Sequence, residues 1–350
     1  MKKLSAVTAT LALLCLGSLA QATVIPTVPV GNPGNAGELS GSGAGGYGPD
    51  RICGSVGYAY NIGKYEVTAG QYTDFLNKVA VTDTYSLYNT YMADTSWGSG
   101  ISRSGVSGSY TYSVATGFIN RPVSFVSFWD SVRFANWLHN GQPTGLQNAL
   151  TTEDGAYAIN GYNGQFGQSI VRKPGARWFI PSEDEWYKAA YYKGGGLNAG
   201  YWDYPTRSNT APGRDMNDAS GNNANCFGSL PLQIDNGKYT TVVGEFQNSA
   251  SPYGTFDQEG NVWEWNETIP YQDSYAACRG MSGGAFEFYP RRASDRGYMG
   301  PAYTVSGNFV GGMTGPGFRV AEAVPEPSSL AILAGGILAL AGMARRRRDG

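Results

Sequence analysis

Three stretches of the chain repeat apolar residues at the three- and four-residue spacing of an amphipathic helix. In the first, AGQYTDFLNKV, the side chains of Tyr72, Phe75, Leu76 and Val79 fall on one side. Thr68 stands directly before this run, and threonine is a favoured N-cap residue. The pattern therefore predicts a helix over 69–79 that begins at Thr68.

The second and third stretches carry stronger start signals. Ser127 with Asp130 opens the run FWDSVRFANWL, and Ser182 with Glu185 opens the run EDEWYKAAYY. A serine followed three residues later by an acid is the capping-box pattern, in which each side chain binds the backbone of the other residue. The sequence thus predicts two further helices, over 128–138 and 183–192.

Elsewhere the pattern favours short strands and irregular loops. The runs YAYNIGKYEVT (58–68) and GFRVA (317–321) have the apolar and β-branched content of strands. Glycine accounts for 50 of the 350 residues, and aromatic residues make up 13%. This composition indicates a loop-rich α+β fold rather than a helix bundle.

Both ends of the chain read as targeting segments. Residues 1–22 contain two lysines, a short apolar run and the small-residue site Ala20-Gln21-Ala22, the pattern of a cleaved secretory signal peptide. An N-terminal membrane helix is the weaker interpretation, because the run is short and ends in small residues.

Residues 324–350 combine a Val-Pro-Glu-Pro start, an apolar stretch over 330–343 and four arginines. The stretch is marginal for a transmembrane segment, and the arginines would remain on the cytoplasmic side. This tail resembles the bacterial PEP-CTERM sorting signal, which implies recognition by an exosortase and cleavage near the Pro-Glu-Pro. An ordinary C-terminal anchor is the alternative. Either interpretation places the body outside the inner membrane, in the periplasm, at the cell surface or outside the cell, after a transient anchoring.

The whole chain has a formal charge of minus 2. The two N-terminal lysines contribute plus 2 and residues 345–349 contribute plus 3, so the body without them carries about minus 7. Such an acidic body is not expected to bind nucleic acid.

Few residues of the mature chain are suited to a soft-metal or iron site. It keeps Cys53, Cys226 and Cys278, which allow at most one internal disulfide and leave its pairing open. His139 is the one histidine in the sequence, and its place after a predicted helix suggests that it caps carbonyl groups or is solvated. Zinc and iron sites built from histidine and cysteine clusters are therefore not expected.

Two segments between the ends are rich in small residues. Residues 23–57 form a Gly/Pro/Ser-rich lead-in that we expect to be mobile, so the folded domain is predicted to span 58–323. The Tyr-, Ser- and Gly-rich stretch 81–120 reads as an insertion, either lining a binding face or forming a surface loop.

Six blocks in order carry a family resemblance. They are YEVTAGQYTDFLN (65–77), RPVSFVSFWDSVRFANWL (121–138), RWFIPSEDEWYKAAYY (177–192), GTFDQEGNVWEW (254–265), RGMSGG (279–284) and GFRV (317–320). Together they resemble the successive blocks of the formylglycine-generating enzyme, or sulfatase-modifying factor, family. The resemblance implies a single α+β domain of the C-type-lectin-like sort, low in regular secondary structure.

The resemblance also implies two structural calcium sites. Calcium prefers carboxylate, amide and main-chain oxygen ligands. One family site matches Asp257 and Glu264 by side chain and Gly260 and Val262 by main chain. A second matches Asn225 and Asp235 by side chain, and Cys226 and Gly237 by main chain. A metal-free alternative is that Glu264 accepts hydrogen bonds and fixes its loop.

This sequence lacks the residues that carry out the oxidation for which the family is named. Family oxidases bind copper(I) through two cysteines after the Gly-Gly turn, but the stretch 281–297 contains no cysteine. Related enzymes bind iron through several histidines, and His139 alone cannot form such a site. No copper is therefore expected, and the sequence favours a non-enzymatic role.

Aromatic and basic residues replace the cysteine-bearing segment, which is a common mixture at ligand contacts. The candidates are Phe286, Phe288, Tyr289, Arg291, Arg292 and Arg296. Equally, the phenylalanines can belong to the core and the arginines can be solvated or paired with Asp295.

We therefore expect an exported, non-oxidase relative of this family that serves as a binding or structural module of the bacterial envelope or matrix. Its expected partners are the secretion machinery, an exosortase and a glycan or protein ligand of unknown identity. The alternative is a divergent oxidoreductase, or another enzyme that uses the same cleft.

Overall fold

The computed structural model describes a defined part of the chain, and every structural statement below refers to it. The described residues are 22–226, 234–272, 277–282, 292–302, 304 and 315–324. The predicted signal peptide, except for its last residue, and nearly all of the predicted sorting tail lie outside this part. Within it, no helix is both long enough and apolar enough to cross a membrane.

The three predicted helices are confirmed, and each begins where its capping residue predicts. They are α1 (Ala69–Val79), α2 (Phe128–His139) and α3 (Glu183–Tyr191). All three start with a complete capping box, made by Thr68 with Gln71, Ser127 with Asp130, and Ser182 with Glu185. The reciprocal bonds satisfy backbone N–H groups that have no partner inside the helix. Four short 3-10 helices, η1 (Ser42–Ala44), η2 (Thr90–Ala93), η3 (Thr116–Phe118) and η4 (Gly196–Asn198), lie in the connections.

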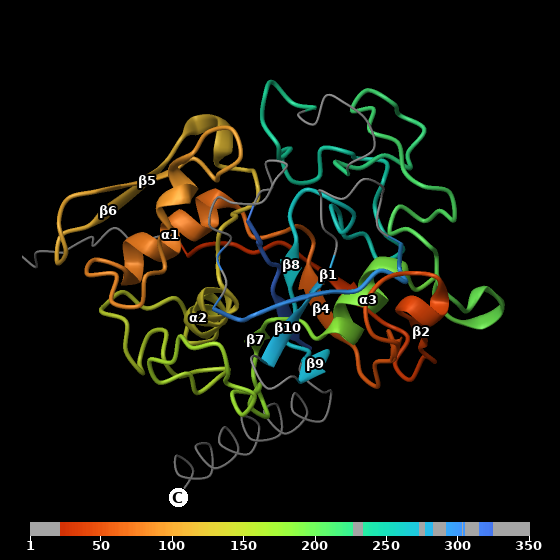
Figure 1. The fold of residues 1–350 in the computed structure, drawn as a ribbon, viewed down its shortest axis with the longest axis horizontal. Coiled ribbons are helices and arrows are strands. Elements are labelled where there is room, and N and C mark those ends of the chain that lie inside the picture. The colour runs from red at the N-terminus through yellow and green to blue at the C-terminus, as the bar shows by residue number, and fades with distance from the viewer. Residues whose placement is uncertain are drawn as a thin grey trace, which may run out of the picture.

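Two four-stranded antiparallel arrangements lie in the centre of Figure 1, with α1 and α2 on one side and α3 on the other. The first has the order β1-β4-β12-β7, with β1 (Thr27–Val30), β4 (Tyr60–Gly63), β12 (Ala321–Ala323) and β7 (Trp178–Phe179). The second has the order β11-β10-β8, with β9 also paired to β10; its strands are β11 (Gly297–Met299), β10 (Ala277–Ser282), β8 (Glu264–Trp265) and β9 (Tyr271–Gln272). Two hairpins complete the strands, β2 (Glu38–Ser40) with β3 (Arg51–Cys53), and β5 (Ile101–Ser104) with β6 (Thr111–Val114).

The lead-in over 23–57 is part of the folded body, which differs from the mobile segment that its composition predicts. Strand β1 pairs along its whole length with β4, and Val30 at its end is fully buried. Further along, the N–H of Gly41 donates to the carbonyl oxygen of Ser294 at 2.9 Å. Both contacts join residues that are not neighbours in the chain, and the second joins residues 253 positions apart, so local composition does not reveal them.

The first residue expected in the mature chain is also held in place. The N–H of Thr23 donates to Oε1 of Gln142 at 2.7 Å, and Nε2 of Gln142 donates to the carbonyl oxygen of Thr23 at 2.8 Å. One side-chain amide thus binds both backbone groups of Thr23, so contacts to the body reach residue 23, ahead of the predicted domain start at Tyr58.

The insertion over 81–120 packs against α1 rather than standing apart. The hydroxyl of Tyr112 in β6 donates to the carbonyl oxygen of Ala80 at 2.9 Å, and its backbone N–H donates to Oδ1 of Asn77 at the same distance. These contacts attach the β5–β6 hairpin to the outer side of α1 (Figure 1).

An aromatic core joins the helices to the strands. Phe75 of α1 and Phe134 of α2 make an edge-to-face contact with ring centroids 5.3 Å apart, and Phe318 contacts Phe134 at the same distance. Such pairs add to the apolar area that they bury. The core therefore ties the GFRV segment, which leads into β12, to both helices.

Candidate functional site

A fully buried ion pair lies at the centre of the described fold. Arg319 donates from Nε to Oε2 of Glu264 and from Nη2 to Oε1, each at 2.6 Å. Nε1 of Trp186, on α3, donates to the same Oε2 at 2.9 Å. Both side chains of the pair have no exposed surface. The carboxylate between two tryptophans in the sequence is thus held by a guanidinium and by a third tryptophan.

A second buried carboxylate fixes the turn that precedes Glu264. Oε2 of Glu66 accepts from Nδ2 of Asn261 at 2.9 Å, and Oε1 accepts from the N–H of Val262 at 3.2 Å. Gly260 and Asn261 both have positive φ, of 96° and 59°. A glycine is needed at 260 because an added Cβ would lie 2.3 Å from the carbonyl oxygen of Asn225.

Asp257 adds a third carboxylate to this centre. Its Oδ2 accepts from the N–H of Gly244 at 2.6 Å. Burial, opposed by this bond and by Arg319, raises the pKa of Asp257 to about 6. Burial and the negative charges of Asp257 and Glu264 also raise the pKa of Glu66 well above its usual range.

The same carboxylates stabilise the charged form of Arg319. Burial works to lower its pKa, but the Glu264 carboxylate outweighs burial, so the pKa of Arg319 is raised. With all three carboxylates ionised, they exceed the one guanidinium by two negative charges; with Glu66 protonated, as its raised pKa favours, the excess is one. Buried charge of one sign is costly unless a partner compensates it.

This charge excess decides how well calcium fits the first predicted site. A divalent cation would neutralise it, and carboxylate and main-chain oxygens are suitable ligands. However, both oxygens of Glu264 already bind Arg319, and within the described ranges no three His, Cys, Asp or Glu side chains are arranged to hold a metal ion. The donor set thus fits in ligand type, but of its two carboxylates Asp257 alone lacks an arginine hydrogen bond, and calcium here stays a prediction.

The second predicted site lies next to the first. The carbonyl oxygen of Asn225 accepts from the N–H of Asn261 at 3.0 Å, and Nδ2 of Asn225 donates to the carbonyl oxygen of Tyr239 at 2.8 Å. Asp235 forms an ion pair with Arg121, so a guanidinium also binds the carboxylate of this site.

The two main-chain positions of the second site are less informative. The carbonyl oxygen of Gly237 accepts from Oγ of Ser96 at 3.3 Å, and Cys226 is buried. The segment 227–233 between the two halves lies outside the described residues. Calcium at this position also stays a prediction, with weaker support than at the first.

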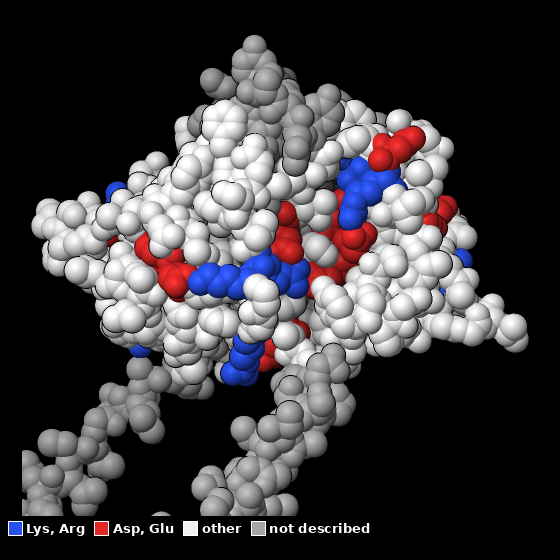
Figure 2. All heavy atoms as spheres, turned by 90° about the horizontal axis from the view of Figure 1, so that it is seen from below, with Lys and Arg blue, Asp and Glu red and all other residues white. Residues whose placement is uncertain are grey.

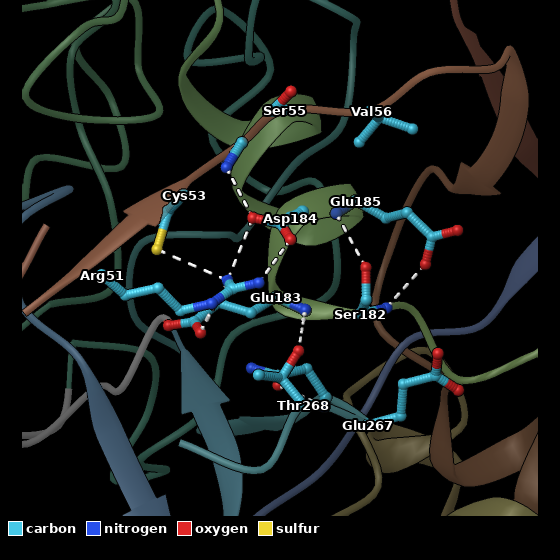
Figure 3. Close-up of polar contacts among 12 residues, drawn as sticks. Arg51, Cys53, Ser55, Val56, Ser182, Glu183, Asp184, Glu185, Glu267 and Thr268 are labelled. Atoms are coloured by element: carbon cyan, nitrogen blue, oxygen red, sulfur yellow. Dashed lines mark hydrogen bonds and ion pairs between the residues drawn. The ribbon is translucent and has the colours of Figure 1, made fainter. Parts of the chain in front are cut away.

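The acidic first turn of α3 binds arginines from three other segments, and Figure 3 shows the contacts of Arg51. Glu183 accepts from Nε and Nη2 of Arg296 at 2.6 and 2.7 Å. Asp184 accepts from Nη1 of Arg51 at 3.0 Å. These acids therefore join β3 and the segment before β11 to the start of α3, in addition to favouring its N-terminus.

Glu185 makes the third connection from the same turn. It accepts from Nη1 and Nη2 of Arg172 at 2.9 and 2.7 Å, and from the hydroxyl of Tyr58 at 2.7 Å. Arg172 in turn pairs with Glu267, which lies beside this turn in Figure 3. Each acid of the turn is thus occupied by a structural contact.

The structure describes two of the six predicted ligand-contact residues. Arg296 is buried in its pair with Glu183 and does not face solvent. Arg292 is exposed, and its Nε lies 3.4 Å from the hydroxyl of Tyr204. The other four candidates, Phe286, Phe288, Tyr289 and Arg291, lie outside the described residues.

Cys53 and Cys226 are enclosed, the side chain of Cys278 lies outside the described part, and the histidine has a structural partner. Cys53 and Cys226 are free thiols with 0% and 2% of their surface exposed. Burial raises the pKa of the Cys53 thiol to about 12 and raises that of Cys226 further. Nδ1 of His139 accepts from the N–H of Arg177 at 3.0 Å, so this histidine binds an N–H group rather than capping carbonyls.

The face in Figure 2 carries a short band of Lys and Arg side chains with Asp and Glu side chains close on either side. Elsewhere on the described surface, Lys173 pairs with Asp154 and Arg177 pairs with Glu322. Cations that are paired with neighbouring carboxylates do not form the continuous basic surface that nucleic acid requires.

Sequence reasoning missed two members of the central site, Glu66 and Arg319. Both stand inside blocks that carry the resemblance, YEVT and GFRV, but they lie 253 positions apart in the chain. Arg319 could have been predicted, because a buried carboxylate such as Glu264, between two tryptophans, needs a cation as its partner.

Comparisons with known proteins agree with this architecture. The family model of the sulfatase-modifying factor enzyme 1-like domain matches residues 54–324, and the PEP-CTERM protein-sorting motif matches residues 323–348. No curated protein matches the sequence.

Several solved structures are similar at low sequence identity. A crystal structure of CarF has a TM-score of 0.50 and 20% identity, covering 87% of this chain and 100% of that chain. Variable protein 1 of Treponema denticola has a TM-score of 0.48 and 18% identity, covering 85% and 94%. PvdO from Pseudomonas aeruginosa has a TM-score of 0.46 and 17% identity, with the same coverage. At this identity the likeness to CarF speaks to the fold alone.

The family match confirms the predicted α+β fold of the formylglycine-generating-enzyme type, and the sorting motif marks the protein for export and membrane-associated sorting by exosortase-type machinery. Since the family model covers most of the chain, this protein belongs to the family of the sulfatase-modifying factor enzyme 1-like domain.

Proposed function

We propose that the protein is a non-oxidase member of this family and acts as a binding or structural module of the bacterial envelope or extracellular matrix. The observation that carries the proposal is the state of its thiols. The stretch 281–297 has no cysteine, and Cys53 and Cys226 are buried with raised pKa values.

Buried thiols are poor candidates for the family's copper chemistry. Copper(I) is held by thiolates, and a thiol whose pKa is about 12 is almost entirely protonated at neutral pH. Cys53 also lies 3.7 Å from Nη1 of Arg51, inside the ion-pair network of the α3 turn (Figure 3). Its surroundings are those of a packed structural residue.

A thiol titration tests this proposal. The Cys278→Ser variant, purified without its signal peptide, retains Cys53 and Cys226 as its cysteines. We expect both thiols to resist a chromogenic disulfide reagent in the native protein and to react after unfolding in guanidinium. Rapid reaction of either thiol in the native state, or stoichiometric copper(I) binding by the unmodified protein, would contradict the proposal.

We also propose structural calcium, chiefly at the first predicted site. The support is the excess of carboxylate charge around Glu66, Asp257 and Glu264 together with the oxygen-rich turn at Gly260 and Val262. Calcium should raise the melting temperature and a chelator should lower it, because a ligand that binds the folded state stabilises it.

Two variants separate the calcium sites. The response to calcium should disappear in Glu264→Ala if the first site binds the ion, whereas Asp235→Ala reports on the second site. An unchanged melting temperature with calcium and with chelator in the unmodified protein would rule out both.

The sorting motif also supports a proposal for where the protein acts. After export, the C-terminal segment would anchor the chain transiently in the inner membrane until an exosortase acts near Pro325-Glu326-Pro327. The body would then act in the periplasm, at the cell surface or outside the cell, where a glycan or a protein is the expected ligand.

A further inference from the structure

A surface hollow of about 620 Å³ lies beside the segment that follows α3. It is lined by Lys193, Leu197, Ala199, Trp202, Arg207 and Pro252. Nζ of Lys193 lies 4.4 Å from the centroid of the Trp202 ring, within the range of a cation–π contact. The hollow therefore combines an aromatic ring, two cations and a small apolar area.

Neither cation of the hollow forms an ion pair with a described residue. In the part of the chain that the structure describes, no ion pair involves Lys193 or Arg207, and no acid lines the hollow. Glu38 acts electrostatically with Lys193, but its carboxylate accepts from the hydroxyl of Tyr187 at 2.7 Å. By contrast, most other described arginines bind carboxylates, so these two cations are available to an external anion.

The apolar side chains restrict what that anion can be. Trp202 is half-buried and lines the concave wall, and Leu197 is fully exposed at the rim. A concave site with one ring and a few polar groups is typical of a small-molecule or sugar site. A lipid surface would need these groups on a convex tip, where all of them can reach the bilayer together.

We infer that this hollow binds an acidic saccharide, with a sugar ring against Trp202 and its carboxylates at Lys193 and Arg207. The inference rests on the proposed function as a binding module and names its ligand class. The apolar face of a sugar ring matches an indole, and guanidinium and ammonium groups are suited to carboxylates.

The segment that follows Trp202 contacts the predicted ligand-contact segment. The N–H of Ala293 donates to the carbonyl oxygen of Asp203 at 2.8 Å, directly after Trp202 in the sequence. The exposed Arg292 contacts Tyr204 on the same segment.

Calorimetric titration of the full protein with oligogalacturonate, and with its methyl ester as a neutral control, tests the inference. The acidic sugar should bind, and the ester should bind at least tenfold more weakly. Lys193→Met and Arg207→Met should each weaken binding of the acid about tenfold, and Trp202→Ala should abolish it. Lys78→Met, which changes a cation near the end of α1, is the matched control and should bind as the unmodified protein does.

The variants change surface residues, and an unchanged urea midpoint checks that each one is folded. Equal binding of acid and ester, or tight binding that none of the three variants weakens, would overturn the inference. Binding to phosphatidylglycerol vesicles without binding to the saccharide would overturn it in favour of a lipid ligand. A failed saccharide titration leaves the thiol test of the proposed function unaffected, so the two failures are distinguishable.

Discussion

Replacing Arg319 with methionine should destabilise the protein more than replacing Glu264 with glutamine, although the two residues form one ion pair. Arg319 faces three carboxylates, whereas Glu264 is one of those three. Arg319→Met leaves Glu66, Asp257 and Glu264 without a cation, while Glu264→Gln leaves Arg319 with two carboxylates nearby.

The structure sets the expected magnitudes. Removing one partner of a buried ion pair costs about 3–5 kcal/mol. Arg319→Met also removes donors at 3.0 and 2.9 Å from the carbonyl oxygens of Gly63 and Phe256, so we place it at the upper end of that range. Glu264→Gln keeps one acceptor oxygen, but its NH2 group replaces the other and faces an N–H donor of Arg319 or Trp186, so we place it at the lower end of that range, about 3 kcal/mol.

Urea denaturation followed by tryptophan fluorescence measures both costs, because Trp186 and Trp265 are buried near the pair. Comparable slopes against urea would show that the variants unfold in the same manner, so that midpoints report stability. Arg177→Met is the matched control, since Arg177 is 69% exposed in its pair with Glu322 and should cost about 1 kcal/mol or less. A larger cost for Glu264→Gln than for Arg319→Met would refute the carboxylate excess.

Three further predictions concern other parts of the fold. Burial raises the pKa of Asp130 from 3.8 to about 6, so the unfolded chain loses this proton first and the free energy of unfolding falls as the pH rises from about 4 to about 6. Relative to the unmodified protein, Asp130→Asn should therefore gain about 2 kcal/mol in free energy of unfolding between pH 4 and pH 7. A difference between the two proteins that stays constant with pH would contradict this. Gln142→Ala should cost about 1–2 kcal/mol and speed hydrogen exchange near Thr23 and along β1, whereas unchanged exchange there would show that the amide does not hold the segment. Arg296→Met should cost about 3 kcal/mol in urea denaturation because Glu183 is buried, and a cost below about 1 kcal/mol would argue against the buried pair.

Local signals in the sequence predicted the helices and their starts. The capping boxes at Ser127 and Ser182 involve residues three positions apart, so the sequence contains both partners in one short run. The short strand β12 could be predicted only in part, and its pairing with β4 could not, because pairing between residues 60–63 and 321–323 depends on the rest of the fold.

Contacts between distant segments account for what the sequence analysis missed. The composition of the lead-in predicts mobility, but pairing of β1 with β4 and the binding of Thr23 by Gln142 order it. Likewise, the pairing of Glu183 with Arg296 links residues 113 positions apart, so Arg296 reads as an exposed ligand contact until the fold is known.

The candidate site was predictable in part and through the family resemblance. The resemblance pointed to Asp257, Gly260 and Glu264, and the structure places Glu264 in the buried centre with Asp257 close enough to interact with its charge. It gave no role to Glu66 or Arg319, because the charge balance of a buried cluster depends on all of its members.

The most direct test of the central claim is turnover of a cysteine-containing sulfatase peptide. The purified protein is incubated with the peptide, copper(I), a reductant and oxygen, and the product is analysed by mass spectrometry beside an active family oxidase as a positive control. We predict that the peptide cysteine remains unchanged while the control converts it to formylglycine. Conversion of the peptide by this protein, at a rate that rises with copper(I), would contradict the account.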